Sequence, residues 1–144
     1  MRRIWGDPLE LIQFKILNTA IERILNQEMA DIGLTYTQAT VIGFLKQNMG
    51  QDICQKDIEY SLGLTHPTVS SIISRMEDRG MILTEPLPSD HRYKRIKLTE
   101  SAISRSECIH EKIAHIKTQV FAGMTPEQEA FIDTAVKAMI QNIS

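Results

Sequence analysis

The chain has 144 residues, of which 42% are hydrophobic and 24% charged, with a formal net charge of -2 at pH 7. These values indicate one soluble globular domain, and they exclude a protein that coats nucleic acid through overall positive charge. The longest apolar runs, such as residues 41–45, are too short to cross a membrane. Glu10, Gln13 and Lys15 would interrupt any signal-peptide core. Two cysteines are too few for a disulfide framework and suit the reducing cytoplasm, where we expect the protein.

The first predicted helix runs from about residue 7 to residue 32. Asp7 has the residue type of an N-cap, Pro8 suits the first helical position, and Glu10 suits the third. Apolar residues then recur at helical spacing as far as Gly33. The resulting apolar face is longer than a small domain needs to cover itself.

Two shorter helices are predicted next. Residues 35–38 form a capping box at the start of the first, which ends at Gly50. Asp52 or Cys54 caps the second, which ends at Gly63. The expected buried stripe of the first helix consists of Val41, Ile42, Leu45 and Met49.

The fourth predicted helix begins at Thr65, whose hydroxyl is expected to cap its first turn, and tolerates Pro67 there. Gly80 ends it as a left-handed residue. One face is apolar and buried, and the opposite face is small and rich in hydroxyl groups, so it can approach another surface closely. The apolar stripe is Val69, Ile72, Ile73 and Met76, and the outer face is Pro67, Thr68, Ser70, Ser71, Ser74 and Arg75.

A hairpin follows this helix. Residues 81–85 predict a short strand, residues 86–90 cannot continue it, and residues 93–98 predict the return strand. Residues 91–98 carry no acid and four cations, namely Arg92, Lys94, Arg95 and Lys97. Residues 35–98 therefore predict a winged helix-turn-helix lobe that binds duplex DNA, in a mainly α chain with a small β-wing.

The same stretch resembles the MarR (multiple-antibiotic-resistance regulator) family. The motifs that carry the resemblance are Thr68-Val69-Ser70, Met-Glu-Asp-Arg-Gly-Met-Ile at 76–82, Asp-His-Arg at 90–92 and Leu-Thr at 98–99. They occur in the family's order and spacing, and the likeness extends over residues 1–144 as a single domain. The chain departs from the family at Glu85, where members often carry an Arg near the first wing strand, and at Glu59, where members usually carry an Ala.

The two ends of the chain are predicted to be helical and to form a dimerisation region over 7–32 and 99–143. Thr99 caps a long helix that ends at Gly123, and residues 125–128 form a capping box for the last helix. One interpretation is a helical subdomain packed on the lobe of a monomer. We favour a helical layer shared by two copies, because two lobes would then match a pseudo-palindromic operator. The family resemblance implies the same homodimer.

The start of the fourth helix is expected to lie in the major groove, where Ser and Thr hydroxyls discriminate weakly between bases. His66 would contact a phosphate or a base edge, or is simply exposed, and Arg75 would clamp a phosphate or remain solvated. Arg92 is expected to enter the minor groove, where the negative potential is focused. Asp90 would orient an Arg or shape the turn. The expected DNA-binding residues are Thr65, His66, Pro67, Thr68, Ser70, Ser71, Arg75, Asp90, Arg92 and Lys94.

No catalytic motif or cofactor site is evident, so we do not expect an enzyme. Glu107, His110 and Glu111 share one helix face, but a solvated polar face explains them better than a metal site. Cys54 lies at a helix N-terminus, where the helix dipole lowers the pKa of a thiol. It would therefore be a redox sensor or a small buried side chain.

The sequence as a whole predicts a homodimeric transcription regulator, expected to be a repressor. The predicted signal is a small amphipathic or aromatic effector that binds between the dimer layer and the lobe, near 33–37 and 99–106. The resemblance implies the same effector site. The alternatives are a redox- or metal-responsive sensor and a DNA-architectural protein without a regulatory role.

Overall fold

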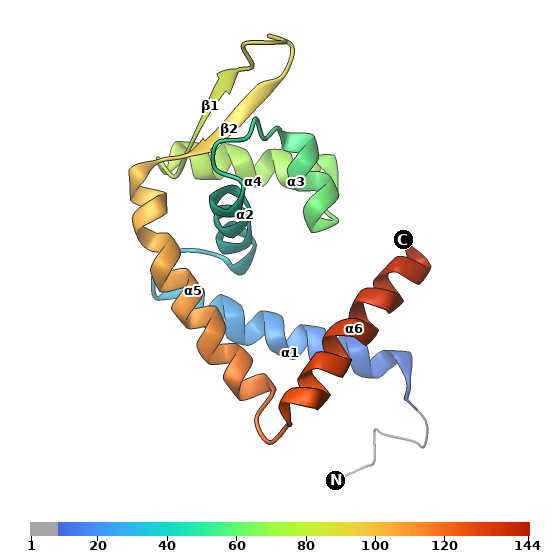
Figure 1. The fold of residues 1–144 in the computed structure, drawn as a ribbon. Coiled ribbons are helices and arrows are strands. Elements are labelled where there is room, and N and C mark those ends of the chain that lie inside the picture. The colour runs from blue at the N-terminus through green and yellow to red at the C-terminus, as the bar shows by residue number, and fades with distance from the viewer. Residues whose placement is uncertain (1–8) are drawn as a thin grey trace.

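The computed structural model describes residues 9–144, which form six helices and one antiparallel pair of strands (Figure 1). The predicted fold class and element order are confirmed. The elements are α1 (Leu11–Ala30), α2 (Tyr36–Gln47), α3 (Gln55–Leu62), α4 (His66–Asp78), β1 (Ile82–Pro86), β2 (Lys94–Leu98), α5 (Glu100–Val120) and α6 (Pro126–Ile143).

The boundaries of α1 differ from the prediction. The expected start at Asp7 and Pro8 lies outside the described residues. Glu10, expected at the third helical position, is instead the N-cap, and its N–H donates to Gln13 Oε1 over 2.7 Å. Residues 9 and 10 are therefore not helical, because Gln13 supplies the side chain that closes the first turn.

Helices α2, α3 and α4 and the hairpin enclose one apolar core. Ile58 and Val69 are fully buried in it, together with Ile82 of β1. The loop before α3 is joined to the hairpin, since the Ile96 N–H donates to the Ile53 carbonyl over 2.8 Å. The segments from α2 to β2 therefore pack together as one lobe. Met49, expected in the buried stripe of α2, is 55% exposed because the helix ends before it.

The N-terminus of α4 confirms Thr65 as the N-cap residue but not its expected hydrogen bond. The Thr65 hydroxyl donates to the Thr68 hydroxyl over 2.9 Å and accepts nothing from the backbone. Thr68 occupies the third helical position, so its own hydroxyl competes with the backbone N–H for Thr65. Along the predicted stripe, Ile72 is half-buried, unlike Val69 and Met76.

The C-terminus of α4 ends in a Schellman motif. Gly80 has φ +70°, its N–H donates to the Glu77 carbonyl over 3.0 Å, and the Met81 N–H donates to the Met76 carbonyl over 2.9 Å. These two bonds satisfy carbonyls that the helix end would leave unpaired. They also fix the direction in which the chain enters β1.

The remaining helices lie away from the hairpin. Helix α5 leads from the end of β2 past α2 to α1, and α6 diverges from α5 after the turn that joins them (Figure 1). Helix α6 has no buried residue, even though it carries large apolar side chains. Phe131 is 74% exposed and Ile140 is 56% exposed. No helix within residues 9–144 is long and apolar enough to span a membrane.

Gly80 and Gly43 form a matched pair for testing the end of α4. Gly80→Ala should lower the free energy of unfolding by about 1–2 kcal/mol, because an Ala in the left-handed region carries that steric cost. Gly43 lies inside α2, has no positive φ, and has space for a Cβ. Gly43→Ala should therefore raise stability by up to about 1 kcal/mol. Urea denaturation measures both, and equal stability of Gly80→Ala and wild type would show that position 80 carries no such steric cost.

Candidate nucleic-acid interface

The outer face of α4 is fully accessible. The residues expected to enter a major groove are all exposed: Thr65, His66, Pro67, Thr68, Ser70, Ser71 and Arg75. The buried Val69, Ile73 and Met76 hold the opposite face against the core. The helix therefore presents short hydroxyl side chains where a second surface can approach closely.

The tip of the hairpin holds Arg92 in one orientation. The Arg92 Nε and Nη2 atoms donate to Asp90 Oδ1 and Oδ2 over 3.0 and 2.8 Å, and the Arg92 N–H donates to Asp90 Oδ1 over 3.1 Å. These bonds hold the pKa of the Asp90 carboxyl below its ordinary value and raise the pKa of the Arg92 guanidinium. Asp90 thus both closes the turn and orients the Arg92 side chain.

A groove of about 460 Å³ separates α4 and the start of α3 from the hairpin. It brings together four of the ten predicted residues, His66, Ser70, Arg92 and Lys94. The other six lie outside it: Thr65, Pro67, Thr68, Ser71, Arg75 and Asp90. Lys56 of α3 adds a third cation and lies 5.9 Å from the centre of the Tyr93 ring. The groove is therefore a cation-lined channel beside the accessible face of α4, suited to an anionic strand.

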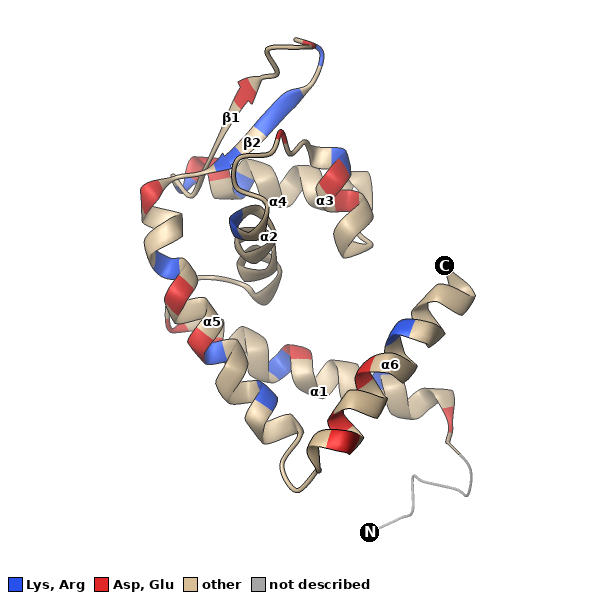
Figure 2. Ribbon diagram, viewed as in Figure 1, with Lys and Arg blue, Asp and Glu red and all other residues tan. Residues whose placement is uncertain are grey.

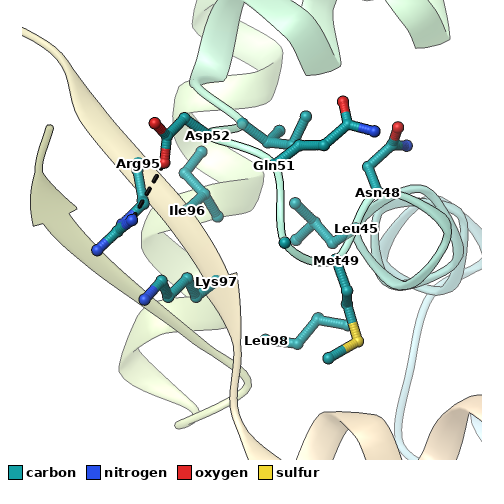
Figure 3. Close-up of a pocket in the computed structure, with 11 residues that line it drawn as sticks. Leu45, Asn48, Met49, Gln51, Asp52, Arg95, Ile96, Lys97 and Leu98 are labelled. Atoms are coloured by element: carbon teal, nitrogen blue, oxygen red, sulfur yellow. Dashed lines mark hydrogen bonds and ion pairs between the residues drawn. The ribbon is translucent and has the colours of Figure 1, made fainter. Parts of the chain in front are cut away.

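The other two cations of the hairpin are neutralised on its opposite face. Arg95 donates to Asp52 over 3.1 Å (Figure 3). Arg95 also donates to Glu85 over 2.6 Å, and Lys97 lies 2.9 Å from Glu85. Figure 2 shows the acid of β1 opposite the basic β2. These contacts lower the pKa of Glu85, first through Lys97 and then through Arg95, and raise that of Arg95. The cations of segment 91–98 therefore lie on two faces of the hairpin. Arg95 and Lys97 are paired with acids on one face, and Lys94 lines the groove on the other.

Arg95 also closes one side of a recess of about 320 Å³ between β2, the end of α2 and the loop before α3. Figure 3 shows the Arg95–Asp52 ion pair at its edge and the apolar side chains of Leu45, Ile96 and Leu98 within it. Sequence analysis did not predict that Asp52 and Glu85 pair with cations of the wing. The acid at 85, where the family often has an Arg, was the available signal.

A third acid, whose contact sequence analysis did not predict, lies against the start of α4. Glu59 of α3 hydrogen-bonds to His66 Nδ1, and the Gln55 amide nitrogen lies 3.3 Å from both Glu59 Oε1 and the His66 carbonyl. His66 remains 72% exposed by side chain, whereas Glu59 is 18% exposed. Helix α3 therefore orients the first side chain of α4.

Cys54 does not have the activated thiol that its position predicted. It is the N-cap of α3, and its N–H donates to Asp57 Oδ2 over 2.8 Å. Burial raises the pKa of the Cys54 thiol, and the carboxylates of Asp57 and Asp52 raise it further. The expected effect of the helix dipole is thus outweighed by partial burial and two nearby acids.

A larger groove, of about 670 Å³, lies between α2 and α5. Tyr36 and Ser106 mark its edge nearest the predicted effector site, but most of the groove lies further along both helices, between residues 39–47 and 107–113. His110 and Glu107 line it. Within residues 9–144 no group of three or more His, Cys, Asp or Glu side chains is arranged to hold a metal ion.

Known structures share this architecture over nearly the whole chain. The crystal structure of the S. aureus MepR–DNA complex is 20% identical, with 95% of this chain and 100% of that chain covered and a TM-score of 0.88. The transcriptional regulator SlyA is 21% identical, with 92% of each chain covered and a TM-score of 0.85. A mutant MarR from E. coli, complexed with operator DNA, is 18% identical, with 88% and 90% covered and a TM-score of 0.80.

At these identities the solved structures establish the fold alone, and the family likeness rests on the sequence match. A model of the MarR family matches residues 32–92, which run from the turn after α1 to Arg92 at the hairpin tip. The matched segment contains α4 and the motifs at 68–70, 76–82 and 90–92. Residues 32–92 therefore match the MarR family, in agreement with the motifs.

Proposed function

We propose that this protein is a DNA-binding transcription regulator that reads duplex DNA with α4 and the hairpin of β1 and β2. The observation that carries the proposal is the accessible, hydroxyl-rich face of α4 beside a channel lined by Lys56, Arg92 and Lys94. The MarR-family match of residues 32–92 supports it, as does the likeness to MepR and MarR structures that were solved with DNA. The family and fold are those of regulators rather than enzymes.

In the proposed complex, the first turns of α4 enter the major groove and the hairpin lies across the neighbouring minor groove. Ser70 and Ser71 would contact base edges, and Arg75 would bind a phosphate further along the helix. Arg92 would exchange Asp90 for the focused negative potential of the minor groove. Lys94 would neutralise a phosphate in the channel, so affinity should fall as salt rises.

Arg92→Ala and Lys97→Ala form a matched test of the wing. Arg92→Ala should weaken operator binding by about 1–3 kcal/mol and flatten its salt dependence, because a contact to DNA is lost. Lys97→Ala removes the same charge from a residue paired with Glu85 and should have a smaller effect. Fluorescence anisotropy over a salt series, on a duplex selected from genomic fragments, measures both. Equal affinity and salt slope for Arg92→Ala and wild type would refute the assignment.

We further propose that residues 7–32 and 99–143 form the dimerisation region, and that residues 35–98 form the DNA-binding lobe. Apolar side chains of α1 and α6 support this, since Leu11, Leu17, Phe131 and Ile140 are each at least half exposed. Pairing these faces between two copies would bury them and set two lobes on successive major grooves. A pseudo-palindromic footprint would support a regulator, whereas broad protection would indicate an architectural protein.

Val136→Asp should dissociate the homodimer and weaken operator binding, because a charge would be buried at the subunit interface and a single lobe meets one half-site. Thr134→Asp is the control, since Thr134 lies on the opposite side of α6 from Val136. Analytical ultracentrifugation at micromolar concentration gives the mass of each variant. A wild-type mass near 16.4 kDa would contradict the dimer.

The groove between α2 and α5 is the proposed effector site. Its volume of about 670 Å³ falls within the range of about 300–1,000 Å³ that small-molecule sites occupy. It lies where the helical layer meets the lobe, so a ligand there would favour one spacing of the two lobes over another. A repressor in the cytoplasm that releases DNA on binding a small aromatic compound is the role we favour.

The competing signal is oxidation of Cys54, which its raised pKa disfavours because fewer thiolates are present to react. Operator-binding titrations of wild type and Cys54→Ser, with peroxide and then with salicylate-like aromatics, separate the two. We expect aromatics to weaken binding by both proteins, and Gly43→Leu, which places a side chain in the groove, to reduce that response. Release of wild type alone by peroxide, with no effect of aromatics, would contradict this assignment.

A further inference from the structure

Contacts from α3 determine which ring nitrogen of His66, the first residue of α4, carries a proton. Glu59 hydrogen-bonds to His66 Nδ1, and an ionised carboxylate can only accept hydrogen bonds. The Gln55 amide nitrogen lies 3.1 Å from His66 Nδ1 and 3.3 Å from both Glu59 Oε1 and the His66 carbonyl, so its two hydrogens can both be directed at oxygen acceptors. The Glu59 contact is the shorter one at Nδ1, and it assigns a proton to Nδ1 in both the neutral and the charged ring.

The other ring nitrogen is the one that can meet DNA. His66 lines the groove between α4 and the hairpin, its side chain is 72% exposed, and Nε2 has no hydrogen-bond partner among residues 9–144. With Nδ1 protonated, neutral His66 offers only a lone pair at Nε2. The imidazolium form offers an N–H there instead. One proton thus changes Nε2 from an acceptor into a donor.

The surroundings of this groove favour an acceptor-rich partner. The charged side chains that line it with His66 are Lys56 of α3, Glu77 of α4, and Arg92 and Lys94 of the hairpin. Three of these four are cations, and Glu77 accepts a hydrogen bond from the Thr84 hydroxyl over 2.6 Å. A DNA strand in this groove would present phosphate oxygens, or the O6 and N7 atoms of guanine, all of which need a donor.

We propose that His66 is a specificity-determining residue that binds a DNA acceptor atom through Nε2–H only in its imidazolium form, with Glu59 as its positioning residue. The inference rests on the proposed DNA-binding function and deepens it, because operator binding would then take up protons. Histidine is the side-chain type whose charge ordinarily changes between about pH 5 and pH 8, which is the range that the test covers. Affinity should be highest on the acid side and fall as pH rises, by at most one proton for each half-site.

The direct test is operator affinity by fluorescence anisotropy between pH 6 and pH 8 at constant ionic strength. Wild type should bind roughly three- to tenfold more weakly at pH 8 than at pH 6, as expected when one histidine proton is linked to binding. His66→Gln should bind with little dependence on pH, because an amide does not titrate. His115→Gln and His91→Gln are the controls, in α5 and at the hairpin tip, and both should keep the wild-type dependence.

Glu59→Ala tests the positioning role. Without the carboxylate, neutral His66 is free to carry its proton on Nε2 and can donate at pH 8, so the pH profile should become flatter. A purely structural role for Glu59 would instead lower affinity by the same factor at every pH. In wild type without DNA, NMR of ¹⁵N-labelled histidine at pH 8 should show the proton of neutral His66 on Nδ1. Circular dichroism at both pH values verifies that each variant is folded.

The outcomes separate this inference from the function on which it rests. Operator binding that is independent of pH, a pH dependence retained in His66→Gln, its loss in His91→Gln, or a neutral Nε2–H tautomer would overturn the inference alone. Failure to select any duplex at either pH would overturn the proposed function and the inference with it. If all duplexes show the same pH effect, the acceptor is a phosphate; if only certain operator variants show it, the acceptor is a base.

Discussion

The accessible face of α4 depends on the burial of the opposite face. Val69 and Met76 are fully buried and Ile73 nearly so, and each buried side chain of this size contributes about 1.5–3 kcal/mol. These side chains fix the rotation of the helix about its axis, so the hydroxyl groups cannot turn inward without exposing apolar surface. The Met81–Met76 backbone bond that ends the helix also sets the start of β1. One buried stripe therefore positions both parts of the proposed DNA-binding surface.

Acidic side chains decide which cations of the hairpin are available to a partner. Glu85 and Asp52 form ion pairs with Arg95 on the face of the hairpin away from the groove, and Asp90 forms an ion pair with Arg92 at the tip. These acids also explain how a chain with a net charge of -2 can carry a basic hairpin. Surface ion pairs contribute little to stability, typically about 0–1 kcal/mol each, so their main effect here is on the direction of the side chains. Lys94 faces the groove without such a pair among residues 9–144.

The features predicted correctly are those that local sequence determines. The capping boxes at Thr35 and Thr125, the left-handed Gly80 and the two strands each depend on a few adjacent residues. The features that sequence analysis missed join distant segments: Arg95 and Asp52 are 43 positions apart, and Glu59 reaches His66 from another helix. Such contacts follow from how α3, α4 and the hairpin pack, which periodicity does not specify. The thiol of Cys54 was misjudged for the same reason, because its burial depends on tertiary contacts.

The lobe is attached to α5 in a way that favours movement as a unit. Thr99, the N-cap of α5, donates to the Gly80 carbonyl over 2.7 Å, at the end of α4. Six residues later, Arg105 donates to the Ile32 carbonyl over 3.3 Å, in the turn before α2. The first turns of α5 are thus bound to the end of α4 and to the turn that leads into α2, whereas the groove between α2 and α5 opens beyond them. A ligand that separates the two helices there would tilt an intact lobe and leave the packing of α4 unchanged. Release from DNA would then result from the misplacement of a folded lobe relative to its half-site.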